Sequence, residues 1–286
     1  MQREPIVAGM FYPADPNRVR AEVAGMLEAA RETAPADGYF AGLVPHAGWA
    51  YSGPTAAQTF AALAASGTPQ TLVVLGAVHS WGVTRPSLYP RGAWDTPLGP
   101  LPVDEALAAS IVREAGGLVV ESARAHGEEH SIEVQLPFVR YLWPEARVVP
   151  LMVPPTDDAV AVGQAIARAA QPHGRDVYLL GSSDLTHYGP RYGFAPAGTG
   201  QAALAYAREN DDRLLDDVVH MRAGRIVERS MADRSACGGG AVAATVAAAA
   251  ALGAYEGLIL GHTTSYDVQP IGRADDFVGY AAVVFS

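Results

Sequence analysis

Two apolar runs, each followed by a histidine, constrain the fold of this chain more than any other feature. One run extends from Tyr39 to Pro45 and precedes His46, and the other extends from Thr71 to Val78 and precedes His79. The segment between them, residues 54–65, has the composition of a helix. Strand, helix and strand within about 30 residues match the size of one βαβ unit.

The two strands of a βαβ unit run parallel, which places both histidines in loops at the same edge of a sheet. Ligands of open α/β sheets bind at that edge. Histidine is the commonest metal ligand among side chains, so two imidazoles in this position predict a metal site that includes His46 and His79.

Strand-like and helical segments alternate through most of the 286 residues. Helices are predicted at 16–34, 104–113, 131–143, 159–170, 201–219 and 241–252, and further strands at 118–121, 147–153, 176–181, 257–261 and 278–285. This alternation predicts an α/β fold with a largely parallel central sheet and helices on both faces. No internal repeat or linker-like stretch interrupts it, so residues 1–286 are expected to form a single domain.

The composition excludes several classes of function. The formal net charge of −10 argues against a nucleic-acid binder. All 20 basic residues are arginine, and without lysine both Schiff-base chemistry and a Walker-type phosphate loop are excluded. No apolar stretch reaches the roughly 20 residues of a membrane span, and the first residues lack the apolar core of a signal peptide. The single cysteine fits a reducing compartment, so we expect a cytoplasmic protein that binds no membrane.

That cysteine, Cys237, precedes three glycines and the alanine-rich helix predicted at 241–252. Backbone N–H groups at a helix N-terminus stabilise a thiolate, which is the form of cysteine that binds metals or acts as a nucleophile. The glycines would let another group approach the backbone closely. Cys237 is thus either a ligand or nucleophile, or a small buried apolar residue, and the local sequence leaves both interpretations open.

A third strand-end loop carries Asp184 and His187, directly after the strand predicted at 176–181. A histidine beside a carboxylate can serve as a general base or as a metal ligand. The alternative is a turn capped by Asp184 with a solvated His187. Because this loop shares its position with those of His46 and His79, a functional role is favoured.

The segment from His126 to His130 has the H-x-x-E-H spacing of inverted zinc proteases. That motif needs a helix to bring both rings to one face, and Gly127 makes a helix doubtful. Glu133 is a candidate for bracing the start of the following helix. The sequence does not decide whether His130 and Glu133 reach the predicted pocket.

Six segments, taken together and in this order, resemble the Memo family, whose bacterial and archaeal members are called AmmeMemoRadiSam system protein B. These segments are Ala8–Pro13, Val44–Gly53, Gly76–Ser80, Glu129–Pro137, Ser182–His187 and Ala236–Gly240. The resemblance covers essentially the whole chain. It implies a fold similar to that of the class III extradiol dioxygenases, which are non-haem iron enzymes with two histidines and one glutamate in the site.

The resemblance also implies the site residues. The family keeps two histidines, here His46 and His79, and has a cysteine in place of the glutamate, here Cys237. Its further pocket residues correspond to Asp184 and His187. An animal member has been described as a phosphotyrosine-peptide binder and as an iron- or copper-binding protein, so a small molecule or a peptide is the expected ligand. Bacterial members accompany a radical-SAM protein and an AMMECR1-like protein, which are the expected partners.

Three functions remain open. The first is a metal-dependent redox enzyme with Fe(II), in which His187 acts as acid and base and Asp184 orients it. A thiolate makes the site softer than a carboxylate would, which favours Cu or Zn as the alternative ion. The second is a non-catalytic metal- or peptide-binding module of a larger assembly, with an entrance formed by Arg85, Arg91 and Trp49. The third is a zinc hydrolase with the same ligands.

Overall fold

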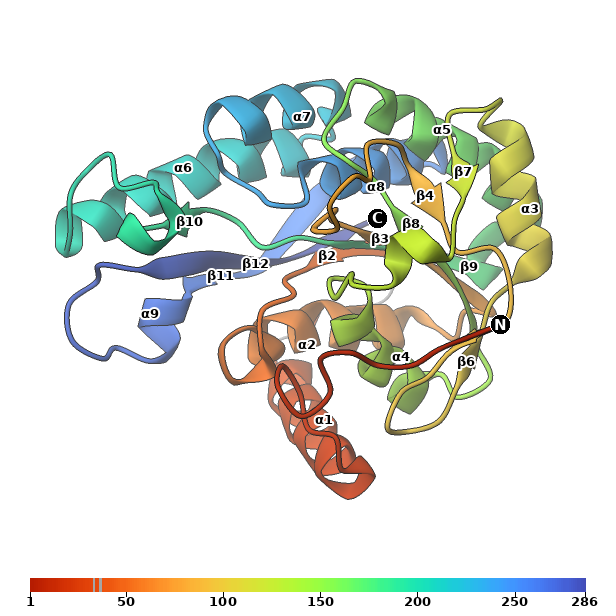
Figure 1. The fold of residues 1–286 in the computed structure, drawn as a ribbon, viewed down its shortest axis with the longest axis horizontal. Coiled ribbons are helices and arrows are strands. Elements are labelled where there is room, and N and C mark those ends of the chain that lie inside the picture. The colour runs from red at the N-terminus through yellow and green to blue at the C-terminus, as the bar shows by residue number, and fades with distance from the viewer. Residues whose placement is uncertain (33, 36–37) are drawn as a thin grey trace.

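The computed structural model describes residues 1–32, 34–35 and 38–286 and has the predicted α/β architecture (Figure 1). Its main sheet has the strand order β10-β12-β2-β9-β3-β8-β4-β7, and β11 pairs with β12. A small second sheet joins β1, β5 and β6.

The strands are β1 (Gln2–Arg3), β2 (Ala41–Val44), β3 (Thr71–Gly76), β4 (Ser87–Leu88), β5 (Ala93–Trp94), β6 (Leu101–Pro102), β7 (Val120–Glu121), β8 (Arg147–Met152), β9 (Val177–Ser182), β10 (His187–Tyr188), β11 (Gly257–Thr264) and β12 (Phe277–Phe285). The α-helices are α1 (Pro16–Arg31), α2 (Trp49–Ser66), α3 (Glu105–Glu114), α4 (Leu136–Leu142), α5 (Asp158–Ala170), α6 (Gln201–Val219), α7 (Ala223–Ala232), α8 (Gly239–Ala251) and α9 (Ser265–Val268).

The centre of the main sheet is parallel and its flanks are mixed. The four strands β2, β9, β3 and β8 run parallel, whereas β12 is antiparallel to β2 and β4 is antiparallel to β8. Every residue of β2, β3 and β9 is buried, as expected for parallel strands covered on both faces.

The predicted βαβ unit is present as β2, α2 and β3, but its two strands are not neighbours. β9 lies between them and pairs with both. The loop that follows β9 therefore leaves the sheet between the loops that follow β2 and β3. Three strand-end loops meet at one place, and this arrangement positions the candidate site.

Helices cover both faces of the sheet (Figure 1). On one face α2 packs against β2 and β12 and is flanked by α1 and α4, while on the other face α8 packs against β2, β3 and β9 beneath α5 and α7. The alanine-rich sequence of α8 allows a very close helix contact. A Cβ added at Gly163 of α5 would lie only 2.3 Å from the carbonyl oxygen of Ala244 in α8.

Some boundaries differ from the sequence-based expectation. α2 begins at Trp49 and contains Pro54 in its interior, where residues 54–65 alone were expected to be helical. The helix expected at 131–143 consists of a 3₁₀ turn (Glu133–Gln135) followed by α4. α1 ends at Arg31, and residue 33 of the helix expected at 16–34 lies outside the described residues. α7 was not predicted.

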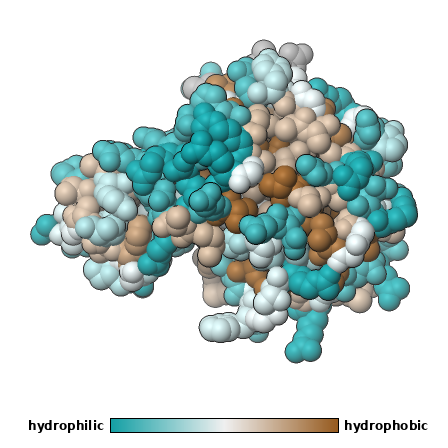
Figure 2. Space-filling model, turned by 90° about the horizontal axis from the view of Figure 1, so that it is seen from above, coloured by the Kyte–Doolittle hydropathy of each residue, from teal (hydrophilic) through white to brown (hydrophobic). Residues whose placement is uncertain are grey.

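One end of the molecule projects beyond the main body. It contains β10, α6, α9 and the adjoining ends of β11 and β12, at the left of Figures 1 and 2, and the outline in Figure 2 narrows where it joins the body. A small apolar cluster that includes Tyr188, Leu204 and Phe277 holds this part together. Among the described residues, no helix is long and apolar enough to cross a membrane.

Candidate metal centre

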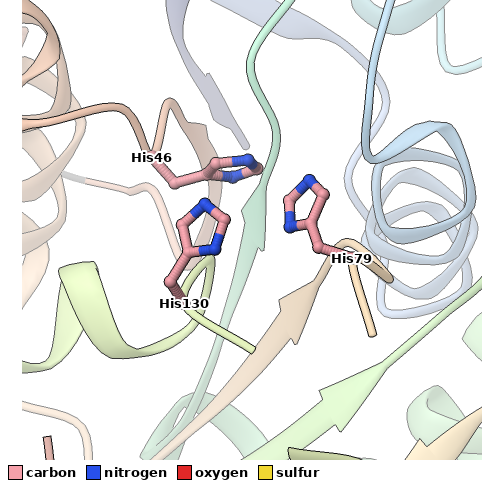
Figure 3. A group of neighbouring side chains, drawn as sticks. All are labelled: His46, His79 and His130. Carbon is pink, nitrogen blue, oxygen red and sulfur yellow. The ribbon is translucent and has the colours of Figure 1, made fainter. Parts of the chain in front are cut away.

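The loops after β2 and β3 bring two histidine side chains together. His46 follows β2 and is 2% exposed, and His79 follows β3 with its side chain 32% exposed. Their ring centroids lie 5.3 Å apart (Figure 3). The two imidazoles thus meet at the carboxyl edge of the parallel strands, where the βαβ pattern placed them.

A third imidazole, that of His130, completes a group that could hold a metal ion. One ring nitrogen from each of His46, His79 and His130 lies within 4.8 Å of the other two. The His130 ring stacks on that of His79 with a centroid distance of 4.6 Å and an interplanar angle of 16°, and Figure 3 shows all three rings converging. The sequence had left open whether His130 reaches the pocket.

The hydrogen bonds of Ser182 define which nitrogen of His46 carries a proton. The single hydroxyl proton of Ser182 is donated to the Ser131 carbonyl at 2.8 Å, while Gln135 Nε2 donates to Ser182 Oγ at 3.1 Å. His46 Nδ1, also 3.1 Å from that oxygen, must therefore be a donor. In the neutral ring this leaves the lone pair on Nε2, which is the atom free to bind a metal.

Glu129 defines which nitrogen of His79 carries a proton. Its carboxylate accepts hydrogen bonds from the His79 backbone N–H at 2.7 Å and the Ser131 N–H at 2.7 Å, and its Oε1 lies 3.1 Å from His79 Nδ1. A carboxylate accepts only, so Nδ1 carries the proton and Nε2 is free. A carboxylate that orients a histidine in this way is a frequent feature of protein metal sites.

Cys237 lies beside these two rings, although it is 191 residues away from His46 in sequence. Its Sγ is 3.2 Å from His46 Nε2. The Cys237 backbone N–H donates to the Asp184 carbonyl at 3.3 Å, and Gly238 N–H donates to Ser183 Oγ at 2.9 Å. A Cβ at Gly238 would lie 2.8 Å from the Ser182 carbonyl oxygen, so the glycine permits the close approach that carries the thiol to the histidines.

The charges of the thiol and the two rings are coupled. Burial by itself would raise the pKa of Cys237, but the adjacent His46 and His79 lower that pKa to about 5. Burial would likewise lower the pKa of His46 and of His79, yet the Cys237 thiolate, with Asp184 beside His46 and Glu129 beside His79, raises both. These shifts favour a thiolate beside imidazolium rings, and a metal ion that binds to them would displace their Nε2 protons.

Asp184 and His187 make separate contacts at the end of β9. Its Oδ1 accepts hydrogen bonds from the backbone N–H groups of His46 at 2.7 Å and Ala47 at 3.2 Å, which fixes the loop after β2. His187 Nδ1 lies 3.1 Å from the Leu185 carbonyl oxygen. Among the described residues no hydrogen bond joins Asp184 to His187, and the expected catalytic roles of these two residues stay predictions.

Glu133 and His126 lie away from the three converging rings. The Glu133 carboxylate accepts from Arg3 at 2.8 Å, from Tyr12 and from the backbone N–H groups of residues 6 and 7, so it anchors the N-terminal segment. His126 Nε2 is 2.9 Å from the Ser87 carbonyl oxygen and belongs to a 3₁₀ turn. This arrangement does not bring His126 and His130 to one face of a helix, as the zinc-protease motif would require.

A cavity of about 540 Å³ opens above the metal-ligating candidates. His46, His79 and His130 line it together with Asp184 and His187. The other candidates for its entrance are placed differently, because Trp49 is 4% exposed and its indole N–H donates to the Val134 carbonyl. Arg85 lines a separate cavity together with Ser80 and Trp81.

The comparisons with known proteins agree with one another. The family model for Memo-like proteins matches residues 3–284. A MEMO1 family protein from Thermococcus onnurineus is 38% identical over 298 residues, covering 100% of this chain and 99% of the relative. A MEMO1 family protein from Methanopyrus kandleri gives the same identity and the same two shares.

One comparison concerns the fold alone. A solved structure of an uncharacterized protein from Escherichia coli K12 aligns with a TM-score of 0.57 and 15% sequence identity. The alignment covers 85% of this chain and 98% of that chain. The α/β architecture is therefore shared with an experimentally determined structure.

Proposed function

This chain belongs to the Memo family, and we propose that it is a metal-dependent redox enzyme that holds one ion through His46, His79 and Cys237. The observation that carries the proposal is the direction of the two imidazoles. Both Nδ1 atoms are engaged by fixed neighbours, Ser182 and Glu129, so both Nε2 atoms remain for a metal.

The distance between Cys237 and His46 supports a shared ion. Zinc–sulfur and zinc–nitrogen bonds of about 2.3 and 2.0–2.1 Å, for example, place the two ligand atoms of a tetrahedral zinc site about 3.5 Å apart. The 3.2 Å between Cys237 Sγ and His46 Nε2 is close to that value. His130 adds a further nitrogen at the edge of the group and is the candidate for a fourth contact.

We propose Fe(II) as the native ion, with Cu or Zn as the alternatives that a thiolate ligand favours. Bound iron or copper would supply one-electron redox chemistry and positions open to a substrate. The protein side chains supply the proton chemistry. His187 lines the cavity with Nδ1 directed at the Leu185 carbonyl, so its Nε2 can accept a proton from a substrate or return one.

Metal content tests the ligand set. Protein purified without oxygen and reconstituted with Fe(II) should bind about one ion per chain, while Cys237→Ala and His46→Ala should lose most of it. The exposed His173 provides the matched control, and His173→Ala should keep the metal. Unchanged metal content in the Cys237 and His46 variants would refute the proposed centre. Elemental analysis of native protein kept under reducing conditions distinguishes Fe, Cu and Zn.

A non-catalytic module is the second candidate, because a thiolate replaces the carboxylate of the iron dioxygenases that the family resembles. Turnover distinguishes the two. If the metal-loaded protein oxidises a catechol or a comparable small aromatic, and His187→Gln slows that reaction without loss of metal, the protein is an enzyme. A metal-loaded protein that oxidises none of these compounds would favour the module.

A further inference from the structure

The cavity above the proposed metal centre has two arginines in its lining. Arg191 comes from the 3₁₀ turn Pro190–Tyr192 that follows β10, and Arg273 comes from the segment between α9 and β12. Both belong to the projecting part of the molecule, so the projecting part forms one wall and the histidine loops form the floor. Neither arginine has a role in the metal centre itself.

The backbone that carries Arg191 is fixed at three points. Its N–H donates to Asp276 Oδ1 at 2.8 Å. The Arg234 guanidinium donates to the carbonyl oxygens of Tyr192 at 3.0 Å and Gly193 at 2.9 Å. Gly193 takes a φ of 62°, which closes the turn. The position of Arg191 over the cavity is therefore set by the fold and not by a loose loop.

The guanidinium groups of Arg191 and Arg273 keep N–H donors that can bind a ligand. Among the described residues, no hydrogen bond or ion pair engages the side chain of Arg191. Arg273 Nε lies 3.5 Å from Asp275 Oδ1, and no acceptor is recorded for its two Nη atoms in the described part of the chain. A guanidinium has five N–H donors in a fork that matches carboxylates and phosphates.

The acidic residues of the same cavity are engaged. Asp184 Oδ1 accepts from two backbone N–H groups, and Asp276 Oδ1 accepts from the N–H of Arg191. One oxygen of each carboxylate thus accepts from backbone N–H groups, while the two guanidinium groups keep N–H donors that no acceptor among the described residues engages. Its walls also carry the aromatic rings of Tyr51, Tyr192, Tyr266 and Tyr280, which suit the body of an organic molecule.

We propose that the cavity selects small organic molecules that carry a carboxylate or a phosphate, with Arg191 and Arg273 binding the anionic group. The remainder of the molecule then extends toward His46, His79 and His130. The inference rests on the proposed function and deepens it by naming the substrate class. Charge-assisted hydrogen bonds to arginine are roughly twice as strong as those between neutral groups, enough to select an anion over a neutral analogue.

The test compares matched ligands on metal-loaded protein by calorimetry. Benzoate and phenyl phosphate are the two anionic probes, and benzyl alcohol is the neutral one. At least one of the two anions should bind more tightly than the alcohol. The anion that binds more tightly shows whether the cavity prefers a carboxylate or a phosphate. In the Arg191→Gln/Arg273→Gln double variant the dissociation constant for that anion should rise about tenfold or more. Arg20→Gln, at an exposed position on α1, is the control and should change nothing.

Two results would overturn the inference. One is equal affinity for the anions and the alcohol, including no binding of any of them. The other is an anion affinity that the double variant leaves at the wild-type value. The same titrations on metal-free protein separate this inference from the proposed function. A dependence on the two arginines there supports anion selection even if the wild-type protein binds no metal.

Discussion

At the scale of single residues, two of the three rings of the candidate metal centre are each oriented by a neighbour that is not a candidate ligand. Ser182 orients His46, and Glu129 orients His79 and also binds two backbone N–H groups. Burial opposes ionisation of Glu129, but the hydrogen bonds and charge of His79 hold its pKa well below the ordinary range. Glu129 therefore keeps the negative charge that would make His79 a better metal ligand.

Glu129→Gln should weaken metal binding about 10- to 100-fold. Glutamine has no negative charge, and its side-chain NH₂ would face one of the three N–H groups of His79 and Ser131 that donate to the carboxylate. The matched control is Glu128→Gln, which changes the exposed neighbouring residue and should keep the wild-type affinity. Competition with a chelator of known affinity measures both. A Glu129→Gln protein as tight as the wild type would show that this contact does not tune the site.

His126 should make the protein less stable in acid. Its Nε2–H donates to the Ser87 carbonyl, while its buried Nδ1 has no hydrogen-bond partner among the described residues. A proton on Nδ1 would be buried without an acceptor, and this burial lowers the pKa of His126 to about 4. The unfolded chain, with the ordinary value of about 6.5, therefore binds more protons between pH 6.5 and 4.

The neutral form of His126 contributes fully to the free energy of unfolding above pH 6.5, and this contribution is lost as the pH falls toward 4. The free energy of unfolding should drop by at most about 3 kcal/mol over that range because of this residue. Urea unfolding of the wild type and His126→Gln at pH 7 and pH 4.5 measures it. The variant should lose less stability on acidification, and an equal loss in both proteins would contradict the assignment. His173→Gln, at an exposed position, is the control.

At the scale of elements, the parallel strands bring the loops together, and close helix contacts keep them in place. α5 and α8 approach each other so closely that Gly163 has no room for a side chain. Cys237 lies directly before the N-terminus of α8. The contact between α5 and α8 therefore supports one ligand of the proposed ion. The helix pair is thus part of the structure that positions the site.

Gly163→Ala should destabilise the protein by about 1–3 kcal/mol, because the added Cβ would meet the Ala244 carbonyl oxygen and the Ala247 Cβ. The matched control is Gly25→Ala in α1, where no atom lies within 4 Å of the added Cβ. That change should stabilise the protein by about 0.5–1 kcal/mol, since alanine favours the helix. Thermal unfolding of the two variants should shift in opposite directions, and a neutral Gly163→Ala would contradict the observed packing.

Most elements could be predicted because their apolar patterns are local. β2, β3 and β9 are continuous apolar runs, and α1, α5 and α6 repeat apolar residues at helical spacing. α7 escaped prediction because its buried face contains only Ala223, Ile226 and Ser230. The insertion of β9 between β2 and β3 could not be predicted, since strand order depends on contacts between distant segments.

In the candidate site, too, local patterns could be predicted and contacts between distant segments could not. The convergence of His46 and His79 followed from parallel strands alone. The local sequence named Cys237 as a candidate ligand, but its grouping with His46 came from the resemblance to a family, because nothing near it in the sequence indicates that it meets a residue 191 positions earlier. His130 lies in a loop between two turns, where no periodic pattern fixes its direction. Glu129 precedes His130 directly in the sequence, but its hydrogen bond to His79 could not be predicted.

At the scale of the whole molecule, the candidate centre joins segments from both ends of the chain. The first half provides His46, His79 and His130, and the second half provides Cys237. The projecting part contributes His187 and the two arginines of the further inference. The metal proposal and the substrate proposal therefore depend on one arrangement, in which the sheet edge forms the floor of the cavity and the projecting part forms a wall.

The most direct test of the account is X-ray absorption spectroscopy at the metal edge of the loaded protein. For protein loaded with zinc, the account predicts one sulfur neighbour at about 2.3 Å together with nitrogen neighbours at about 2.0–2.1 Å. In Cys237→Ala the sulfur signal should disappear from any metal that remains. A spectrum of the wild-type protein with nitrogen and oxygen neighbours alone would contradict a centre built from His46, His79 and Cys237.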